Sequence, residues 1–137
     1  LHLSIRRQRQ MCIRDSIKDE SFILLGDFNV IPENIDAYDA DKWINDALFT
    51  IETRKEFREI VSLGLNDMYR AYNPLAKDFT FWDYQRGAWQ KNEGIRIDHI
   101  LASPIAADQI TNIIIDKEER DKNKPSDHVP IIAEIDI

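Results

Sequence analysis

The fold of this chain is decided first by the stretch SFILLGDF at residues 21–28. It is a short, continuous apolar run that is interrupted by Gly26 and continues past Asp27. A run of this length between turn signals suits a β-strand better than a helix, and its lack of alternation suits a strand covered on both faces. We therefore predict a buried strand over 21–28, followed by a loop in which Pro32 and nearby Asn and Asp residues form turns.

Four further segments have the composition of β-strands. The segment 78–84 is aromatic, 95–103 begins with alternating apolar residues, and 109–116 and 129–137 are rich in isoleucine. Strands that are separated by loops and by one or two helices indicate an α/β (α+β) fold. In such a layer the strand ends are the places where polar residues can gather.

One segment has a clear helical pattern. Thr53 and Glu56 have the spacing of a capping box, and Gly64 stands where the first residue beyond a helix belongs. Short helical turns are expected over 43–49. The apolar face of the main helix would consist of Phe57, Ile60 and Val61.

Length and composition limit the class of protein. The 137 residues make one domain at most, and 43% hydrophobic with 31% charged residues is typical of a soluble globular protein without a membrane segment. The lone Cys12 cannot form an internal disulfide, which fits a reducing compartment and no structural zinc. The net charge of −7 argues against a wholly basic nucleic-acid surface, yet acids gathered around a metal would give the same total.

The first 16 residues differ from the rest of the chain. They combine four arginines with two glutamines and keep no apolar period. The stretch lacks the apolar region of a secretory signal, and it resembles translated sequencing-adaptor sequence. We therefore interpret 1–16 as a non-native segment and 17–137 as the domain.

Carboxylates and their partners stand at or inside three apolar runs. Asp27 and Asn29 lie in GDFN, Asp98 lies in RIDHIL, and Asp127 with His128 precedes the last strand. A buried carboxylate must be paired, hydrogen-bonded or bound to a cation to stay ionised. The three groups are therefore predicted to converge on one ion, for which Mg²⁺ is the natural candidate because it prefers hard oxygen ligands and substrate phosphates. Phosphoester hydrolysis is the chemistry that this pattern favours.

Each piece alone has a simpler explanation. GDFN could be a strand that ends in an Asx-turn, and SDH could be a capped turn with a structural histidine. Asp98 could form an ion pair with Arg96 or Arg86, and the aromatic residues of 78–84 could be core. Only their combination in this order favours a site.

The segments LLGDFNVIP, GLNDMYRAYNP, FTFWDYQRGAWQKNEGIRIDHILAS and KPSDHVPI together resemble the second half of exonuclease III. The resemblance covers about residues 21–135 and places the chain in the exonuclease III branch of the endonuclease/exonuclease/phosphatase superfamily. It implies half of a four-layered α/β sandwich. It also implies Mg²⁺- or Mn²⁺-dependent hydrolysis of DNA phosphodiesters in base excision repair: 3′ to 5′ exonuclease action on duplex DNA, incision 5′ to abasic sites, and removal of blocking 3′ groups.

The resemblance also implies roles for individual residues. Asp27 would orient or deprotonate the attacking water, while Asn29 holds that water or a phosphate oxygen. Asp98 would fix His128, whose imidazole would then hydrogen-bond a non-bridging phosphate oxygen. Asp27, Asn29 and Asp127 would bind the metal.

The remaining implied residues bind substrate. Phe81, Trp82 and Ile97 would form the apolar wall that receives an extruded sugar without its base. Arg96 would contact backbone phosphates, as would Lys91 and Arg86, for which a solvated loop is an equal alternative. Some relatives carry tryptophan where this chain has Ile95, which leaves the pocket preference open. The implied partner is double-stranded DNA, especially abasic or 3′-blocked, met by a monomer in the bacterial cytoplasm at the nucleoid.

The family's first half supplies another asparagine, a glutamate that is the main metal ligand, and a tyrosine, and none of these is matched here. We therefore expect the chain to be a fragment, inactive alone, that lacks the N-terminal half of its domain. Two alternatives stay open. The chain could be a non-catalytic half-domain, or a phosphodiesterase of the same superfamily that acts on phosphoinositide or sphingolipid head groups instead of DNA.

Overall fold

The computed structural model describes residues 19–137, so the predicted non-native segment 1–16 lies outside the described residues. The strands are β1 (Ile23–Asp27), β2 (Asn66–Asp67), β3 (Asp98–Ala102), β4 (Ile110–Ile115) and β5 (Ile131–Ile135). The α-helices are α2 (Ile51–Ser62), α3 (Met68–Tyr72) and α4 (Pro104–Gln109). Three short 3₁₀ turns complete the order: η1 (Asn34–Asp36), η2 (Ala40–Trp43) and η3 (Lys117–Asp121).

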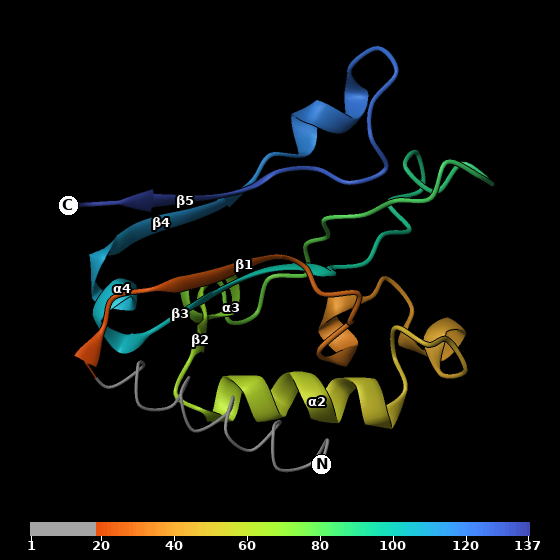
Figure 1. Ribbon diagram of the computed structural model, residues 1–137. Coiled ribbons are helices and arrows are strands. Elements are labelled where there is room, and N and C mark those ends of the chain that lie inside the picture. The colour runs from red at the N-terminus through yellow and green to blue at the C-terminus, as the bar shows by residue number, and fades with distance from the viewer. Residues whose placement is uncertain (1–18) are drawn as a thin grey trace.

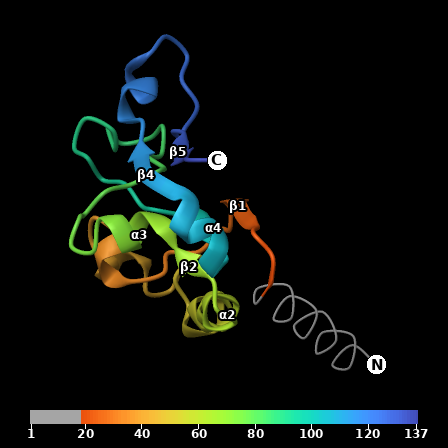
Figure 2. The ribbon, with the colours of Figure 1, turned by 90° about the vertical axis from the view of Figure 1, so that its left-hand side faces the viewer.

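The strands form two small antiparallel sheets. In the first sheet β3 lies between β1 and β2, and the second sheet consists of β4 and β5 alone. Figures 1 and 2 show the sheet β1-β3-β2 in the middle of the molecule, with the β4–β5 pair on one side and α2 on the other. The predicted mixed α/β class is therefore confirmed.

The core lies on both faces of β3, because successive side chains of a strand point to opposite faces. Ile100 and Ala102 pack toward β4 with Ile113, and all three are at least 96% buried. Leu101 points the other way and packs with Phe57 of α2. The central strand is therefore the best buried one, and it carries Asp98 at its first position.

The prediction that the first strand is covered on both faces is wrong. Leu24 is 42% and Leu25 is 66% exposed. Within the described residues β1 is an edge strand that pairs only with β3. Its apolar side chains are therefore less buried than its sequence suggests.

The main helix was predicted one turn too late. Its N-cap is Thr50, whose hydroxyl accepts a hydrogen bond from the Thr53 amide at 3.2 Å, so Thr53 belongs to the first turn. The predicted end is confirmed, because Gly64 follows the C-cap Leu63 with a φ of 113° that favours glycine. Because positions 50 and 53 both hold threonine, the sequence offers two possible N-caps for this helix.

The aromatic segment 78–84 is not a strand. Its backbone makes only isolated bridges, from Phe81 to Ile95 and to His128. The helices α3 and α4 were not predicted, although Ser103 caps α4 and Pro104 occupies its first turn, which is a recognisable start signal. Among residues 19–137 the structure contains no helix that is long and apolar enough to cross a membrane.

Candidate active site

Two carboxylates meet where β1 and β3 begin to separate. The antiparallel register places Asp27 directly opposite Asp98. The preceding Gly26 has a φ of 143°, a conformation that side-chain-bearing residues rarely adopt. The buried Thr80 hydroxyl accepts the Asp98 amide at 3.2 Å and so fixes the start of β3.

The segment that follows Asp27 is a tight turn. The Asn29 amide donates to Asp27 Oδ1 at 2.8 Å, and Asn29 has a left-handed φ of 51°. This is the Asx-turn that GDFN alone would predict. The turn uses only one oxygen of the carboxylate, so the Asx-turn and a chemical role for Asp27 Oδ2 coexist.

His128 reaches the same place from the segment before β5. Its amide donates to Ser126 Oγ at 3.1 Å, which is the capped turn considered for SDH. Its ring nitrogen Nδ1 lies 2.8 Å from Asp98 Oδ2, and Nε2 lies 3.9 Å from Asp27 Oδ2. The expected contact between Asp98 and His128 is thus present, and Asp98 does not pair with Arg96 or Arg86.

The surroundings of His128 favour its protonated form. Burial acts to lower the pKa of the imidazole, but the hydrogen bond to Asp98 and the charges of Asp98, Asp27 and Asp127 outweigh it, so the pKa is raised above 6.5. The ring also packs against Phe81 at 5.2 Å between centroids. One third of the side chain stays exposed, which leaves the ring accessible to a ligand.

We expect Asp98→Asn to lower the pKa of His128, because the neutral amide removes the strongest interaction that favours the imidazolium. Histidine resonances of the chain, followed by NMR against pH, measure the change. The raised pKa of His128 also makes the stability of the fold depend on pH. Its contribution is fully present below about pH 6.5, and it is lost as the pH rises through the folded-state pKa. An unchanged His128 titration in the variant would contradict this coupling.

Asp27, Asp98 and His128 are the one group among residues 19–137 with the geometry of a cation site. They offer ligand atoms that all lie within 4.8 Å of one another. Two carboxylates suit a hard cation such as Mg²⁺. Asn29 is exposed beside this group and Asp127 is half-buried next to His128, but neither is one of the three.

The residues predicted to bind substrate lie at different depths. Phe81 is half-buried and lies at the surface beside His128. Trp82 is fully buried and Ile97 is 3% exposed, so these two pack beneath the surface instead of forming it. Of the three residues predicted to form the apolar wall, only Phe81 is therefore available at the surface.

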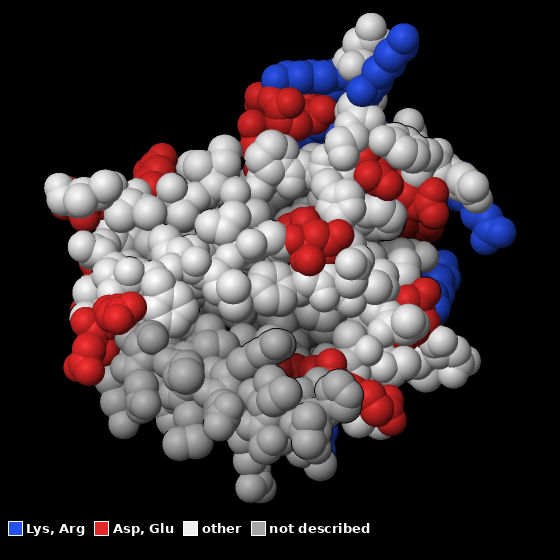
Figure 3. All heavy atoms as spheres, viewed as in Figure 1, with Lys and Arg blue, Asp and Glu red and all other residues white. Residues whose placement is uncertain are grey.

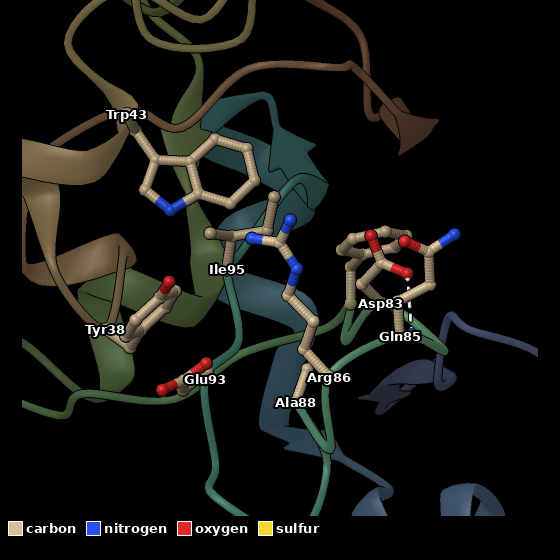
Figure 4. Close-up of a pocket in the computed structure, with 9 residues that line it drawn as sticks. Tyr38, Trp43, Asp83, Gln85, Arg86, Ala88, Glu93 and Ile95 are labelled. Carbon is tan, nitrogen blue, oxygen red and sulfur yellow. Dashed lines mark hydrogen bonds between the residues drawn. The ribbon is translucent and has the colours of Figure 1, made fainter.

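A pocket of about 330 Å³ opens beside Phe81. Figure 4 shows Tyr38 and Trp43 on one side of it, Ile95 at its base, and Arg86 extending across it. The Trp43 indole Nε1 is buried without a hydrogen-bond partner in the described part of the chain. Trp43 and Tyr38 are lining residues that the sequence did not suggest.

Arg96 is not available to a DNA phosphate. It is 1% exposed, and its guanidinium donates to Asp36 at 2.7 Å and to both oxygens of Asp67 at 3.1 and 2.8 Å. The expectation of a phosphate contact is therefore wrong for Arg96, because two buried carboxylates already occupy its donors. Arg86 and Lys91 are exposed.

Lysine and acidic side chains lie together on the loop after β4, at the upper edge of the face shown in Figure 3. This loop leads from η3 directly to Ser126 and His128. A groove lined by Lys122 and Lys124 reaches His128 from this side, and Glu119, which pairs with Lys122, lines it as well.

Comparison with known proteins identifies a family. The model of the endonuclease/exonuclease/phosphatase family matches residues 13–128. Exodeoxyribonuclease III of Haemophilus influenzae is 33% identical over 133 residues, which are 92% of this chain and 50% of that protein. A DNA-(apurinic or apyrimidinic site) endonuclease of Dictyostelium discoideum is 35% identical over 84% of this chain and 31% of its own length.

The chain also resembles solved structures. A 3′ phosphatase from Neisseria bound to a product DNA hairpin superposes with a TM-score of 0.86 at 36% identity, over 93% of this chain and 50% of that one. An AP endonuclease from Archaeoglobus fulgidus has a TM-score of 0.83 at 33% identity, over 95% and 53% of the two chains. The chain spans about half the length of these relatives, or less.

Proposed function

Because the chain belongs to the endonuclease/exonuclease/phosphatase family, we propose that the protein is a nuclease of the exonuclease III branch. It hydrolyses DNA phosphodiesters in base excision repair, with Mg²⁺ as cofactor. Its activities are 3′ to 5′ exonuclease action on duplex DNA, incision at abasic sites and removal of 3′ blocking groups. It works as a monomer on the chromosome in the bacterial cytoplasm.

The observation that carries the proposal is the alignment of Asp98, His128 and Asp27. Asp98 holds Nδ1 of His128 at 2.8 Å, so the opposite ring nitrogen points toward Asp27. In the imidazolium form both ring nitrogens donate. Nε2–H would therefore donate to a non-bridging phosphate oxygen, on which charge builds during the displacement.

Asp27 faces the same space from the other strand. Its carboxylate is 37% exposed and retains one oxygen outside the turn hydrogen bond, so it can orient a water and accept its proton. Asn29, the next polar residue of the turn, would hold this water or a phosphate oxygen. Attack and charge stabilisation would thus come from opposite sides of one phosphate.

The two carboxylates also fit the cofactor. Asp27 would be the principal ligand from this chain, with Asn29 and Asp127 as further ligands at its sides. Bound Mg²⁺ supplies positive charge that polarises the phosphoryl group. Since like charges directly opposite each other in a sheet are unfavourable, the paired Asp27 and Asp98 are a place where a cation is favoured.

The pocket beside Phe81 suits an extruded sugar. Phe81, which lines it, joins it to the site through its contact with His128. Trp43 and Tyr38 add aromatic side chains to its lining. A nucleotide without its base has little stacking to lose on leaving the duplex, so such a pocket would select abasic or damaged ends.

A chimera tests this proposal. Residues 19–137 replace the matching segment of the Haemophilus influenzae exodeoxyribonuclease III, and incision of an abasic duplex is measured with and without Mg²⁺. We expect Mg²⁺-dependent incision, and no cleavage of inositol phosphates or sphingomyelin. A folded chimera that cleaves only those small phosphoesters would assign the site to a different substrate, and one that cleaves nothing would contradict the proposal. The 137-residue chain assayed alone shows whether the segment acts without the rest of the relative.

A further inference from the structure

His99 is a fully buried titratable side chain outside the proposed chemistry. It is 0% exposed, it follows Asp98 directly, and it points to the opposite face of β3. Its Nε2 lies 3.0 Å from the carbonyl oxygen of Val30. Val30 is the residue that follows the turn of Asp27 and Asn29, so His99 contacts the turn from behind.

The tautomer of His99 follows from its other partner. Nδ1 lies 3.1 Å from Nη1 of Arg96, and a guanidinium can only donate. Nδ1 must therefore accept, and the proton must be on Nε2, where it donates to Val30. Burial, and after it the charge of Arg96, lowers the pKa of His99 to about 4, so the ring is neutral at pH 7.

Arg96 is itself held rigidly. Asp67 and Asp36 bind its guanidinium through three of its nitrogens; Arg96 and Asp36 are buried, and the Asp67 side chain is 13% exposed. The imidazole of His99 packs against two aromatic rings, which fix its plane. Its centroid lies 5.7 Å from that of Phe28 and 4.9 Å from that of Phe57. Every atom that sets the position of Nε2–H is thus fixed by packing or by charge.

We propose that His99 is a positioning residue for the proposed nuclease site, and that it fixes the Asp27–Asn29 turn through its hydrogen bond to Val30. The effect of His99 on catalysis rests on the proposed function, whereas its contact with the turn does not. The turn carries strain, because Asn29 has a left-handed φ of 51°. Without the bond to Val30, we expect the turn to relax and Asp27 to lose its alignment with His128.

The first test measures the turn in the full 137-residue chain. Hydrogen exchange of the Asn29 amide, which donates to Asp27, is followed by NMR in the wild type and in His99→Leu, His99→Gln and Ile113→Ala. Leucine fills the space without a donor, whereas glutamine offers amide N–H donors and a carbonyl acceptor. Ile113→Ala is the matched control for general loss of packing, because Ile113 lies in the core on the opposite face of β3.

The measured quantity is the ratio of the Asn29 amide exchange rate to the exchange rate of the slowest core amides. In His99→Leu we expect this ratio to rise at least tenfold above its wild-type value. Glutamine should restore most of the protection, and Ile113→Ala should leave the ratio unchanged. Equal ratios in His99→Leu and the wild type would overturn the proposal, as would the same rise in Ile113→Ala.

The second test uses the same variants in the chimera. His99→Leu should lower kcat by roughly 10- to 100-fold with KM within about threefold, because a misplacement near 1 Å is enough to cost this much. Glutamine should recover kcat. If the wild-type chimera is inactive, the proposed function fails, while the exchange ratio still decides whether His99 holds the turn. If it is active and His99→Leu keeps its kcat, the positioning role is rejected.

Discussion

Asp27→Asn is expected to lower the rate of abasic-site incision by roughly 10²- to 10⁴-fold, the range over which a positioned acid or base contributes. Asparagine keeps the shape of the side chain and the acceptor of the Asn29 turn. It removes the negative charge that would take a proton from water and attract a cation. The loss should therefore fall on kcat, with the fold preserved.

The measurement is single-turnover incision of an abasic duplex by the chimera, with circular dichroism as the check on folding. Asp108→Asn is the matched control, because it removes the same charge from an exposed position on α4, away from the site. We expect this control to keep the wild-type rate. Equal rates for Asp27→Asn and Asp108→Asn would refute the role given to Asp27.

Asp36→Ala is expected to lower the free energy of unfolding by about 3–5 kcal/mol, the usual cost of removing one partner of a buried ion pair. Asp36 is fully buried, and its carboxylate accepts from Arg96 at 2.7 Å and from Arg70 at 2.5 Å. Alanine would leave Arg96 charged and only partly paired in the interior. This loss is a large share of the stability of a small domain.

Urea denaturation of the 137-residue chain measures the change. The control is Arg58→Ala, which removes an ion pair to Glu33 whose two side chains are 58% and 55% exposed. Exposed pairs contribute about 0–1 kcal/mol because water and salt screen them. If both variants lose the same stability, the buried network is not the structural element that we describe.

Local sequence signals predicted those parts of the fold that depend on apolar runs. The segments 109–116 and 129–137 became β4 and β5 because their isoleucines pack across one antiparallel pair. The segment 78–84 failed because its aromatic residues satisfy burial from a loop: Phe79 and Trp82 are core residues without belonging to a strand. In segment 78–84 the composition therefore indicates burial and not backbone pairing, whereas in β1 it indicates pairing and not burial.

The contact between Asp98 and His128 was predicted by the resemblance to exonuclease III, and it is present at 2.8 Å. The ion network behind them was not, because Arg96, Asp36 and Asp67 look like ordinary surface charges in sequence. Only the three-dimensional arrangement shows that three charged groups share one buried position.

The pairings that build the site join residues far apart along the chain. His99 meets Val30 across 69 positions, and His128 meets Asp98 across 30. Such pairings close large loops and slow folding, since the chain must lose much entropy before any contact forms. During synthesis Asp27 therefore stays without His128 and Asp98 until the segments that carry these two residues have left the ribosome.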